Sequence, residues 1–265
     1  IDFPGEGEVK YVEPNDKEHP GGAMKEKGRP LGGKRFLFWV PALLFSFACA
    51  KPLTDIAPDF KSLRPTRVAV LPVKNETADP DAPIVFRILA RAELADRGYA
   101  LVETPLIDAA LREKGIEEAG QIESLTPQEV GECVGADGLL YVTVLGYGRQ
   151  VGVHLKMEGS FTLVEAKTGQ KLWFSELSVS DDIVLEGGAA VLMGELFGGK
   201  DKKKSKQQAL EMYMAMRKAR IAAAVNRFRA HPIRREVFQT ITLDMDKIYL
   251  LDIFFNRNFS KLPRA

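Results

Sequence analysis

The alternation of apolar patterns from Arg67 onward constrains the fold more than any other feature of the sequence. The run RVAVLPV (residues 67–73) is continuous, β-branched and bounded by turn residues, which is typical of a strand covered on both faces. Apolar residues then recur at helical spacing over residues 84–97, up to Gly98, which suits a helix end. A strand, two helices and a further strand are predicted next, over residues 99–104, 105–115, 126–135 and 136–150. This order predicts an α/β sheet with helices packed on it.

The helix over residues 126–135 has the clearest local signals. Thr126 and Glu129 have the spacing of a capping box, in which each side chain bonds the other residue's backbone N–H. Pro127 suits the first helical position and Gly135 suits the exit.

Residues 159–180 contain two runs of alternating apolar residues around a polar break at 166–169. Gly169 can take the left-handed conformation that a short loop needs, so the two runs predict an antiparallel hairpin. Trp173 lies in the second run, and we expect its ring to be buried against the sheet. The predicted fold class is therefore α/β: a mixed sheet with helices packed on it and an antiparallel hairpin half, ending in a long helix.

The long helix is predicted over residues 207–230, and its apolar side suggests a core helix. The residues expected on that apolar face are Leu210, Met214, Ile221, Ala222, Val225 and Phe228. Those expected in solvent are Arg217, Lys218, Arg220, Arg227 and Arg229. Three methionines, at positions 212, 214 and 216, are interpreted as packing residues and not as metal ligands, because thioethers fill irregular gaps in a core.

An apolar run of thirteen residues, Phe36–Ala48, follows a basic flank near the start of the chain. It is shorter than the roughly 20 residues that span a bilayer as a helix, and Pro41 interrupts it. It fits the hydrophobic region of a secretory signal, so we predict a signal peptide over residues 24–48 with translation starting at Met24. Residues 1–23, with six acidic and two basic side chains among Pro and Gly, are interpreted as a disordered leader or spurious upstream sequence.

The end of this run, SFACA, resembles the lipobox of bacterial lipoproteins. That resemblance implies a diacylglycerol attached to the sulfur of Cys49, which becomes the mature N-terminus and holds the protein on the membrane. Residues 49–66 would then form an extended tether. Ala50 is not the aspartate associated with inner-membrane retention in that family, which favours the outer membrane with the domain in the periplasm, or alternatively at the cell surface. A conventional signal with an incidental cysteine is the other interpretation.

Composition and motifs point away from several classes of site. From Cys49 onward the chain has 30 basic and 29 acidic side chains, so its net charge gives no sign of a nucleic-acid partner. GELFGGKD (residues 194–201) resembles the start of a phosphate-binding loop, but Asp201 stands where a hydroxyl must hold magnesium. His154 and His231 lack metal-ligand spacing, and Cys133 is interpreted as a small buried residue and not a nucleophile. We therefore expect no catalytic, cofactor-binding or metal-binding residues.

The segment GGAAVLMGELFGG, residues 187–199, is predicted to face a partner. Its small residues allow close approach between helices, and its many glycines would cost helix stability unless a contact offset them. Self-association or docking on a membrane-embedded partner would supply that contact. A poorly ordered loop over the sheet is the alternative.

Three stretches together resemble a family of bacterial envelope lipoproteins of uncharacterised function. They are RVAVLPVKNETADPDAP (67–83), the region 152–173 that ends in EAKTGQKLW, and the Gly/Ala-rich segment before the long helix. The family's domain is similar to the N-terminal domain of the periplasmic protein TolB and to the curli-secretion pore lipoprotein. The resemblance covers residues 67–231, which we assign to one interaction domain, and leaves 232–265 as a tail without a counterpart.

This resemblance implies a lipid-anchored accessory component of an envelope transport or secretion assembly, without enzymatic activity. Its expected partners are the membrane, through lipidated Cys49, other envelope proteins, and a second copy of the chain. The alternative is a periplasmic enzyme whose site is assembled from residues distant in sequence.

Overall fold

The computed structural model describes residues 51–149, 155–181, 183–197 and 201–265. These belong to one compact unit that spans residues 50–265. The predicted leader, the signal peptide and Cys49 lie outside the described residues.

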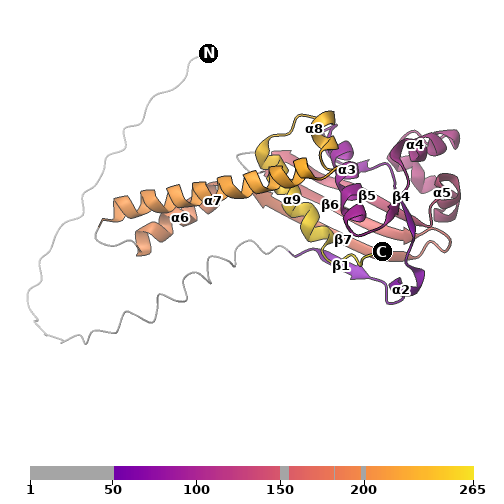
Figure 1. Cartoon of the computed structure of the whole chain (residues 1–265), viewed down its shortest axis with the longest axis horizontal. Coiled ribbons are helices and arrows are strands. Elements are labelled where there is room, and N and C mark those ends of the chain that lie inside the picture. Colours follow the sequence, from indigo (N-terminus) through magenta and orange to yellow (C-terminus); the bar gives the residue numbers. More distant parts are fainter. Residues whose placement is uncertain (1–50, 150–154, 182, 198–200) are drawn as a thin grey trace, which may run out of the picture. The chain divides into compact units, whose positions relative to one another are not determined.

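The described chain forms a seven-stranded mixed sheet in the order β1-β7-β6-β5-β2-β4, with β3 paired to β5 (Figure 1). Strand β2 runs parallel to β4 and β5, whereas β5, β6, β7 and β1 are antiparallel neighbours. The mixed sheet and its antiparallel half confirm the predicted fold class. The strands are β1 (Leu53–Ile56), β2 (Arg67–Val70), β3 (Lys74–Asn75), β4 (Ala100–Leu101), β5 (Gly138–Arg149), β6 (Leu155–Glu165) and β7 (Lys171–Asp181).

Helices cover both faces of β2, as its continuous apolar sequence predicts. Val68 and Val70 join the core that includes α3 and α9, while Ala69 and Leu71 join a second core beneath α4 and α5. The helices are α2 (Phe60–Leu63), α3 (Ala82–Asp96), α4 (Thr104–Glu113), the 3-10 helix η2 (Ala119–Ser124), α5 (Pro127–Val134), α6 (Ile183–Phe197), α7 (Lys202–Ala230), α8 (Glu236–Thr240) and α9 (Met245–Phe259).

The local signals are confirmed where they were clearest. Both halves of the capping box between Thr126 and Glu129 are formed, and Gly135 ends α5 with a φ of +67°. In the hairpin loop Gly169 has a φ of +72°, which is the left-handed conformation that the turn requires.

Trp173 is fully buried, also as expected. Its ring lies 6.5 Å from that of Phe161 and 5.1 Å from that of Phe259, between ring centroids. The register shifts by one residue at this point, because Leu163 pairs with Trp173 and Val164 with Lys171. The bulge leaves Leu172 without a partner on β6, which is why both Leu172 and Trp173 are buried despite the alternation of a regular strand.

The described part of residues 49–66 does not form the extended tether that was predicted. Leu53–Ile56 are a strand that pairs with β7, where Ile56 lies opposite Trp173. Phe60 is buried in the core of the domain. The prolines at 52, 58 and 65 flank β1 and α2 and do not interrupt them, so the prolines did not exclude a strand and a helix in this segment.

The predicted tail, residues 232–265, is part of the core. Asp244 caps α9 by accepting a hydrogen bond from the Lys247 N–H. The aromatic residues Phe254, Phe255 and Phe259 of α9 are buried against β6 and β7. The fold therefore extends beyond the predicted 67–231 domain in both directions, and α7 is the long helix near the C-terminus but not the last helix.

The expectation of a core helix holds for only the second half of α7. Ala224, Val225 and Phe228 are buried in the main core. The three methionines interpreted as packing residues, together with Leu210 and Ala222, are exposed instead. The first half of the helix projects beyond the sheet, and among the described elements α6 lies beside it (Figure 1).

Candidate functional site

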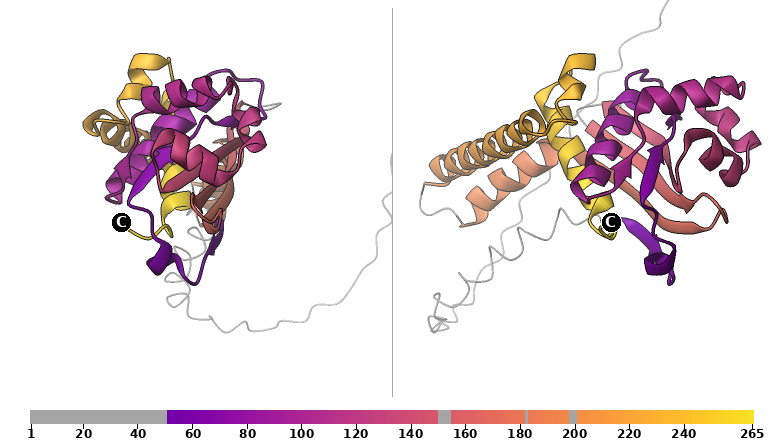
Figure 2. Two further views of the ribbon diagram at one scale, coloured as in Figure 1. Left: turned by 90° about the vertical axis from the view of Figure 1, so that its right-hand side faces the viewer. Right: turned by 45° about the vertical axis from the view of Figure 1, so that its right-hand side comes forward.

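Helices α6 and α7 form a hairpin that projects from the sheet, and Figures 1 and 2 agree that the two helices run side by side. Gly194 of α6 lies directly against the backbone of α7. A methyl group at this position would lie 2.7 Å from the backbone oxygen of Ser205 and 2.8 Å from Cα of Lys206. The small residue thus allows close helix approach, as the sequence suggested, but the helix that approaches is α7 of the same chain.

The hairpin carries large apolar side chains that nothing in the described chain covers. Leu192 is 53% exposed and Leu196 is 64% exposed on α6, and Met212 is 64% exposed on α7. Exposed apolar groups gathered on one element mark interaction surfaces, and methionine adapts its shape to a partner. We call the exposed large apolar side chains of the hairpin, taken together, the hairpin apolar surface: Leu192, Leu196, Leu210, Met212, Met214 and Met216. Helical spacing puts Met212 and Met216 on the side of α7 opposite to Leu210 and Met214.

Arg217 fixes the base of the hairpin. Its guanidinium donates to Oδ1 and Oδ2 of Asp181 at 2.8 and 2.6 Å, and to Oδ1 of Asp246 at 2.7 Å. These carboxylates belong to the end of β7 and the start of α9, so one side chain joins three elements. The hydrogen bonds to Asp181 raise the pKa of Arg217 above its usual value.

Arg217 was predicted to lie in solvent, and this prediction is wrong because the side chain is only 7% exposed. The side of α7 that faces the domain carries a residue at every fourth position here, and Arg217 lies on this side between Tyr213 and Ile221. That spacing, together with an aspartate at the end of the predicted hairpin, is the signal that could have identified the pair.

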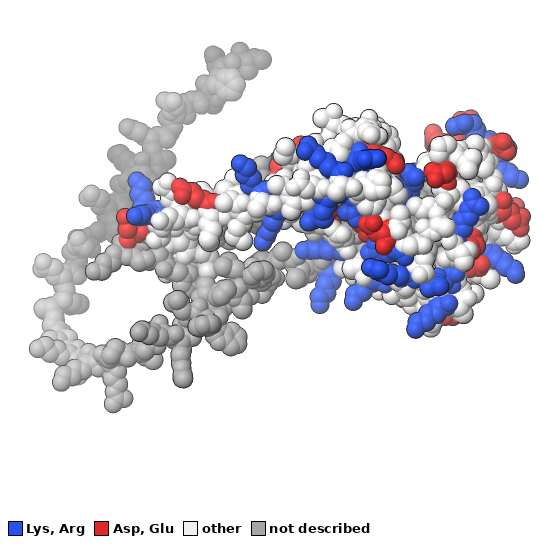
Figure 3. All heavy atoms as spheres, in the orientation of Figure 1, with Lys and Arg blue, Asp and Glu red and all other residues white. Residues whose placement is uncertain are grey.

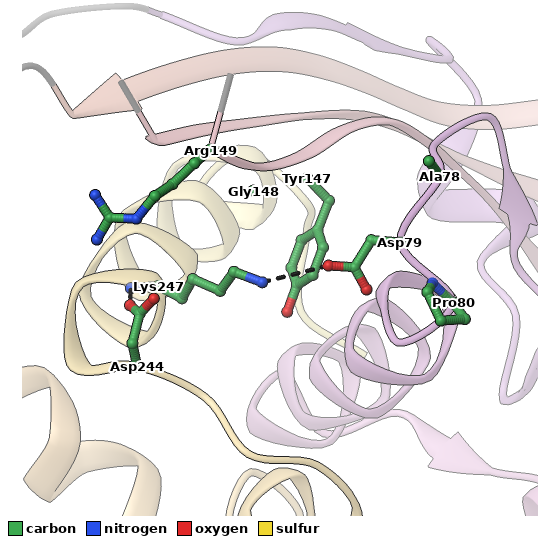
Figure 4. Close-up of a pocket in the computed structure, with 8 residues that line it drawn as sticks. All are labelled: Ala78, Asp79, Pro80, Tyr147, Gly148, Arg149, Asp244 and Lys247. Atoms are coloured by element: carbon green, nitrogen blue, oxygen red, sulfur yellow. Dashed lines mark hydrogen bonds and ion pairs between the residues drawn. The ribbon is translucent and has the colours of Figure 1, made fainter. Parts of the chain in front are cut away.

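An open hollow of about 590 Å³ lies between the end of β5, the start of α9 and the loop before α3 (Figure 4). In it Lys247 Nζ lies 3.3 Å from Oδ2 of Asp79 and 4.5 Å from the centre of the Tyr147 ring. The residues that line the hollow are Ala78, Asp79, Pro80, Tyr147, Gly148, Arg149, Asp244 and Lys247.

The Tyr147 hydroxyl of this hollow is buried and has no hydrogen-bond partner among the described residues. Burial raises the pKa of Tyr147, and the nearby carboxylates of Asp79, Asp81 and Asp244 raise it further. The hydroxyl therefore stays protonated at physiological pH and can donate a hydrogen bond, but it is a poor base. Lys247 and Asp79 neutralise each other beside it.

The residues singled out from the sequence do not come together at this hollow. His231 is the C-cap residue of α7, and its Nε2 lies 3.0 Å from Oδ1 of Asp96. The Cys133 thiol lies 3.1 Å from the Ala110 carbonyl oxygen. Asp201 caps α7 by accepting from the Lys204 N–H, which gives this carboxylate a structural role. His154 and Cys49 lie outside the described residues.

The described residues contain no cluster of three or more His, Cys, Asp or Glu side chains placed to hold a metal ion. Within the same ranges, each helix is too short or too polar to cross a bilayer.

Comparison with known proteins gives a family match over residues 55–197, to the family described as "Putative lipoprotein GNA1162-like". A relative from Neisseria meningitidis serogroup B, described as a "putative lipoprotein", is 26% identical over 158 residues, which cover 56% of this chain and 71% of the relative. The family match ends at the last residue of α6, so α7, α8 and α9 lie beyond it.

Similar solved structures include the lipoprotein GNA1162 of Neisseria meningitidis, with a TM-score of 0.41 and 21% identity, over 51% of this chain and 100% of that chain. The PelC dodecamer of Paraburkholderia phytofirmans matches with a TM-score of 0.37 and 17% identity, over 50% and 83%. The C-terminal domain of Escherichia coli LpoB matches with a TM-score of 0.33 and 22% identity, over 44% and 83%.

Proposed function

The chain belongs to the GNA1162-like lipoprotein family, and from that premise we propose that it is a lipid-anchored, non-enzymatic interaction component of a transport or secretion assembly in a bacterial envelope. The observation that carries the interaction role is the hairpin apolar surface, held away from the sheet on a buried Arg217 ion pair. A fixed, projecting apolar element is suited to docking and needs no reacting groups.

The anchor rests on Cys49. Family membership supports the interpretation of residues 46–50 as a lipobox, and two or three acyl chains hold a protein on a membrane without a spanning helix. We place the anchor in the outer membrane because Ala50 follows the cysteine, with the domain in the periplasm or, alternatively, at the cell surface.

The anchor is tested by metabolic labelling with a radioactive fatty acid, followed by mass spectrometry of the mature N-terminus. Cys49→Ala should lose the label and leave the membrane fraction after a high-salt wash. Cys133→Ala is the matched control, because it removes the other cysteine of the chain and should change neither result. A Cys49→Ala protein that keeps its label would rule out this anchor.

The interaction role is tested by placing a photo-crosslinking amino acid at Leu192 or Leu196 in cells. Leu53, which is 68% exposed on β1, serves as the matched control position. We expect discrete crosslinked products with envelope proteins from the hairpin positions and not from Leu53. Equal crosslinking at all three positions would contradict a docking role for the hairpin.

The rival function is a periplasmic enzyme, and the observation that favours it is the hollow around Tyr147 with its unpartnered hydroxyl. Tyr147→Phe separates the two functions, since it removes the hydroxyl and keeps the ring. Unchanged complementation of a deletion strain by Tyr147→Phe, together with loss of complementation by Leu192→Glu and Leu196→Glu, supports the interaction role. The reverse result supports an enzyme.

A further inference from the structure

Charge is divided unevenly along the domain. The α7 segment, Lys202–Ala230, contains nine lysines and arginines and one acidic residue, Glu211. Residues 103–137, which form α4, η2 and α5, contain nine acidic and two basic residues. The rest of residues 50–265 is balanced, with 19 of each sign. The near-neutral total is therefore the sum of one basic and one acidic region whose net charges are almost equal and opposite.

Internal ion pairs neutralise only part of each region. On α7, Arg217 and Arg227 pair with aspartates of the domain, and Lys206 pairs with Glu195. The exposed basic residues of α7 without an ion pair among the described residues include Lys203, Lys204, Lys218 and Arg220. Their exposed acidic counterparts on the α4–α5 region include Glu113, Glu117, Glu118 and Glu132.

The two regions lie at opposite ends of the domain. Helix α5 packs beside the β6–β7 turn, where a methyl group built on Gly131 would lie 2.5 Å from Cβ of Ala166. Helix α6 follows the other end of β7, and the eleven residues of β7 span about 33 Å. Figure 1 shows the hairpin and the α4–α5 region on opposite sides of the sheet. The exposed half of α7 cannot reach the acidic region of its own molecule.

The exposed side of α7 also offers apolar contact. Met212, Met216, Ala219 and Ala223 are all exposed and recur at spacings of four, three and four residues, which puts them in one stripe. Lys218 and Arg220 flank this stripe, and Figure 3 shows basic side chains spaced along the hairpin, with acidic side chains toward its far end and uncharged surface between them. On the acidic region, Leu106 of α4 is 60% exposed.

We propose that α7 of one molecule docks on the α4–α5 region of a second copy of this chain. Opposite charges steer the two surfaces together, and the stripe with Leu106 supplies desolvated contact. An anionic lipid surface would complement the positive charge of α7, but it would leave the acidic region, whose net charge is nearly as large, without a positively charged partner. The two surfaces differ and lie at opposite ends of the molecule, so two copies can pair reciprocally about a two-fold axis, or the contact can repeat from copy to copy into a closed ring or a filament. This contact does not depend on the lipid anchor.

The test uses two charge-reversal variants of the lipidated protein, purified in detergent. The first carries Lys203→Glu, Lys204→Glu and Lys218→Glu, and the second carries Glu113→Lys, Glu117→Lys and Glu132→Lys. By analytical ultracentrifugation, each alone should self-associate roughly tenfold or more weakly than wild type. An equimolar mixture should associate again, because each variant then meets its opposite charge. Reversal of Lys61, Lys167 and Lys261, which are exposed in the balanced part, is the matched control and should leave association unchanged.

Wild type gives a second measurement that needs no variant. A zero-length carbodiimide crosslinker should join lysines of α7 to carboxylates of residues 103–137, and such a link must be intermolecular. The proposal is overturned if wild type stays monomeric, if the mixed variants stay monomeric while both remain folded by circular dichroism, or if these crosslinks are missing. Wild-type monomers that bind phosphatidylglycerol vesicles through Lys203, Lys204 and Lys218 would assign α7 to lipid phosphate instead.

Discussion

Arg217 joins β7, α7 and α9 through one guanidinium group, and Asp181 depends on it because that carboxylate is only 4% exposed. Arg217→Met keeps the aliphatic length and removes the charge, which leaves Asp181 buried without its cation. Breaking a buried pair in this way costs about 3–5 kcal/mol. We expect the melting temperature to fall by roughly 10 °C in a domain of this size, followed by circular dichroism.

Arg220→Met is the matched control for that substitution, since Arg220 is an exposed arginine one turn further along the same helix. Its melting temperature should stay close to wild type. Equal melting temperatures for both variants would mean that the Arg217 cluster adds nothing to stability.

Asp137 ties the start of β2 to β5, because its carboxylate accepts hydrogen bonds from the Thr66 N–H and hydroxyl and from the Arg67 N–H. Burial alone would raise the pKa of Asp137, but these hydrogen bonds outweigh it and lower the pKa. A lowered pKa stabilises the fold above the unfolded value of about 3.9, and that stability is lost as the pH falls through the folded pKa.

Urea unfolding of wild type and Asp137→Asn between pH 6 and pH 2.5 measures this contribution. Wild type should be more stable at pH 6, and the difference should shrink below a pH of about 3.9. Glu132→Gln, at an exposed carboxylate of the preceding helix, should show no such convergence. A difference that stays constant with pH would assign the effect of Asp137 to shape and not to charge.

At the scale of elements, the sequence predicts what is local and misses what depends on a distant partner. The ends of α5 were predictable because Thr126, Glu129 and Gly135 bond within one turn of the helix. β1 was not predictable as a strand, since its four residues are stabilised by β7, which lies more than a hundred residues later. Periodicity likewise located the inward side of α7 at Val225 and Phe228 but misplaced Arg217, and it did not show how far along the helix other elements would cover it.

The α6–α7 contact gives a prediction at this scale. Gly194→Ala puts a methyl group 2.7 Å from the Ser205 backbone oxygen, so the two helices must separate. Gly188→Ala is the matched control on the same helix, where the added methyl group meets nothing within 4 Å. The control should slightly stabilise α6, by about 0.5–1 kcal/mol, because alanine is the better helix former. Hydrogen exchange of the α6 amides should accelerate in Gly194→Ala and slow in Gly188→Ala; the same change in both would contradict close packing at Gly194.

At the scale of the whole molecule, the residues after 197, which lie beyond the family match, have two structural roles. Helix α9 closes one face of the sheet, with Phe254, Phe255 and Phe259 packed among the rings of Phe86, Phe161 and Trp173. Helix α7 shares that core only through its second half and projects its first half with α6. The sheet and the projecting surface therefore depend on the same C-terminal residues.

Truncation after His231 tests that dependence, since it removes α8 and α9. Loss of one buried phenylalanine costs about 3–5 kcal/mol, so loss of three costs about 9–15 kcal/mol, which is comparable to the 5–15 kcal/mol that an ordinary domain has in total. The truncated chain should lose its cooperative thermal transition and its near-ultraviolet circular dichroism. A chain that ends at Pro263 loses the hydrogen bonds that the last two residues make to Arg97 and Arg64 but keeps α9 whole, so it should stay folded. If the chain cut at His231 still melts cooperatively near the wild-type temperature, residues 232–265 are an appendage, and the sheet is complete without them.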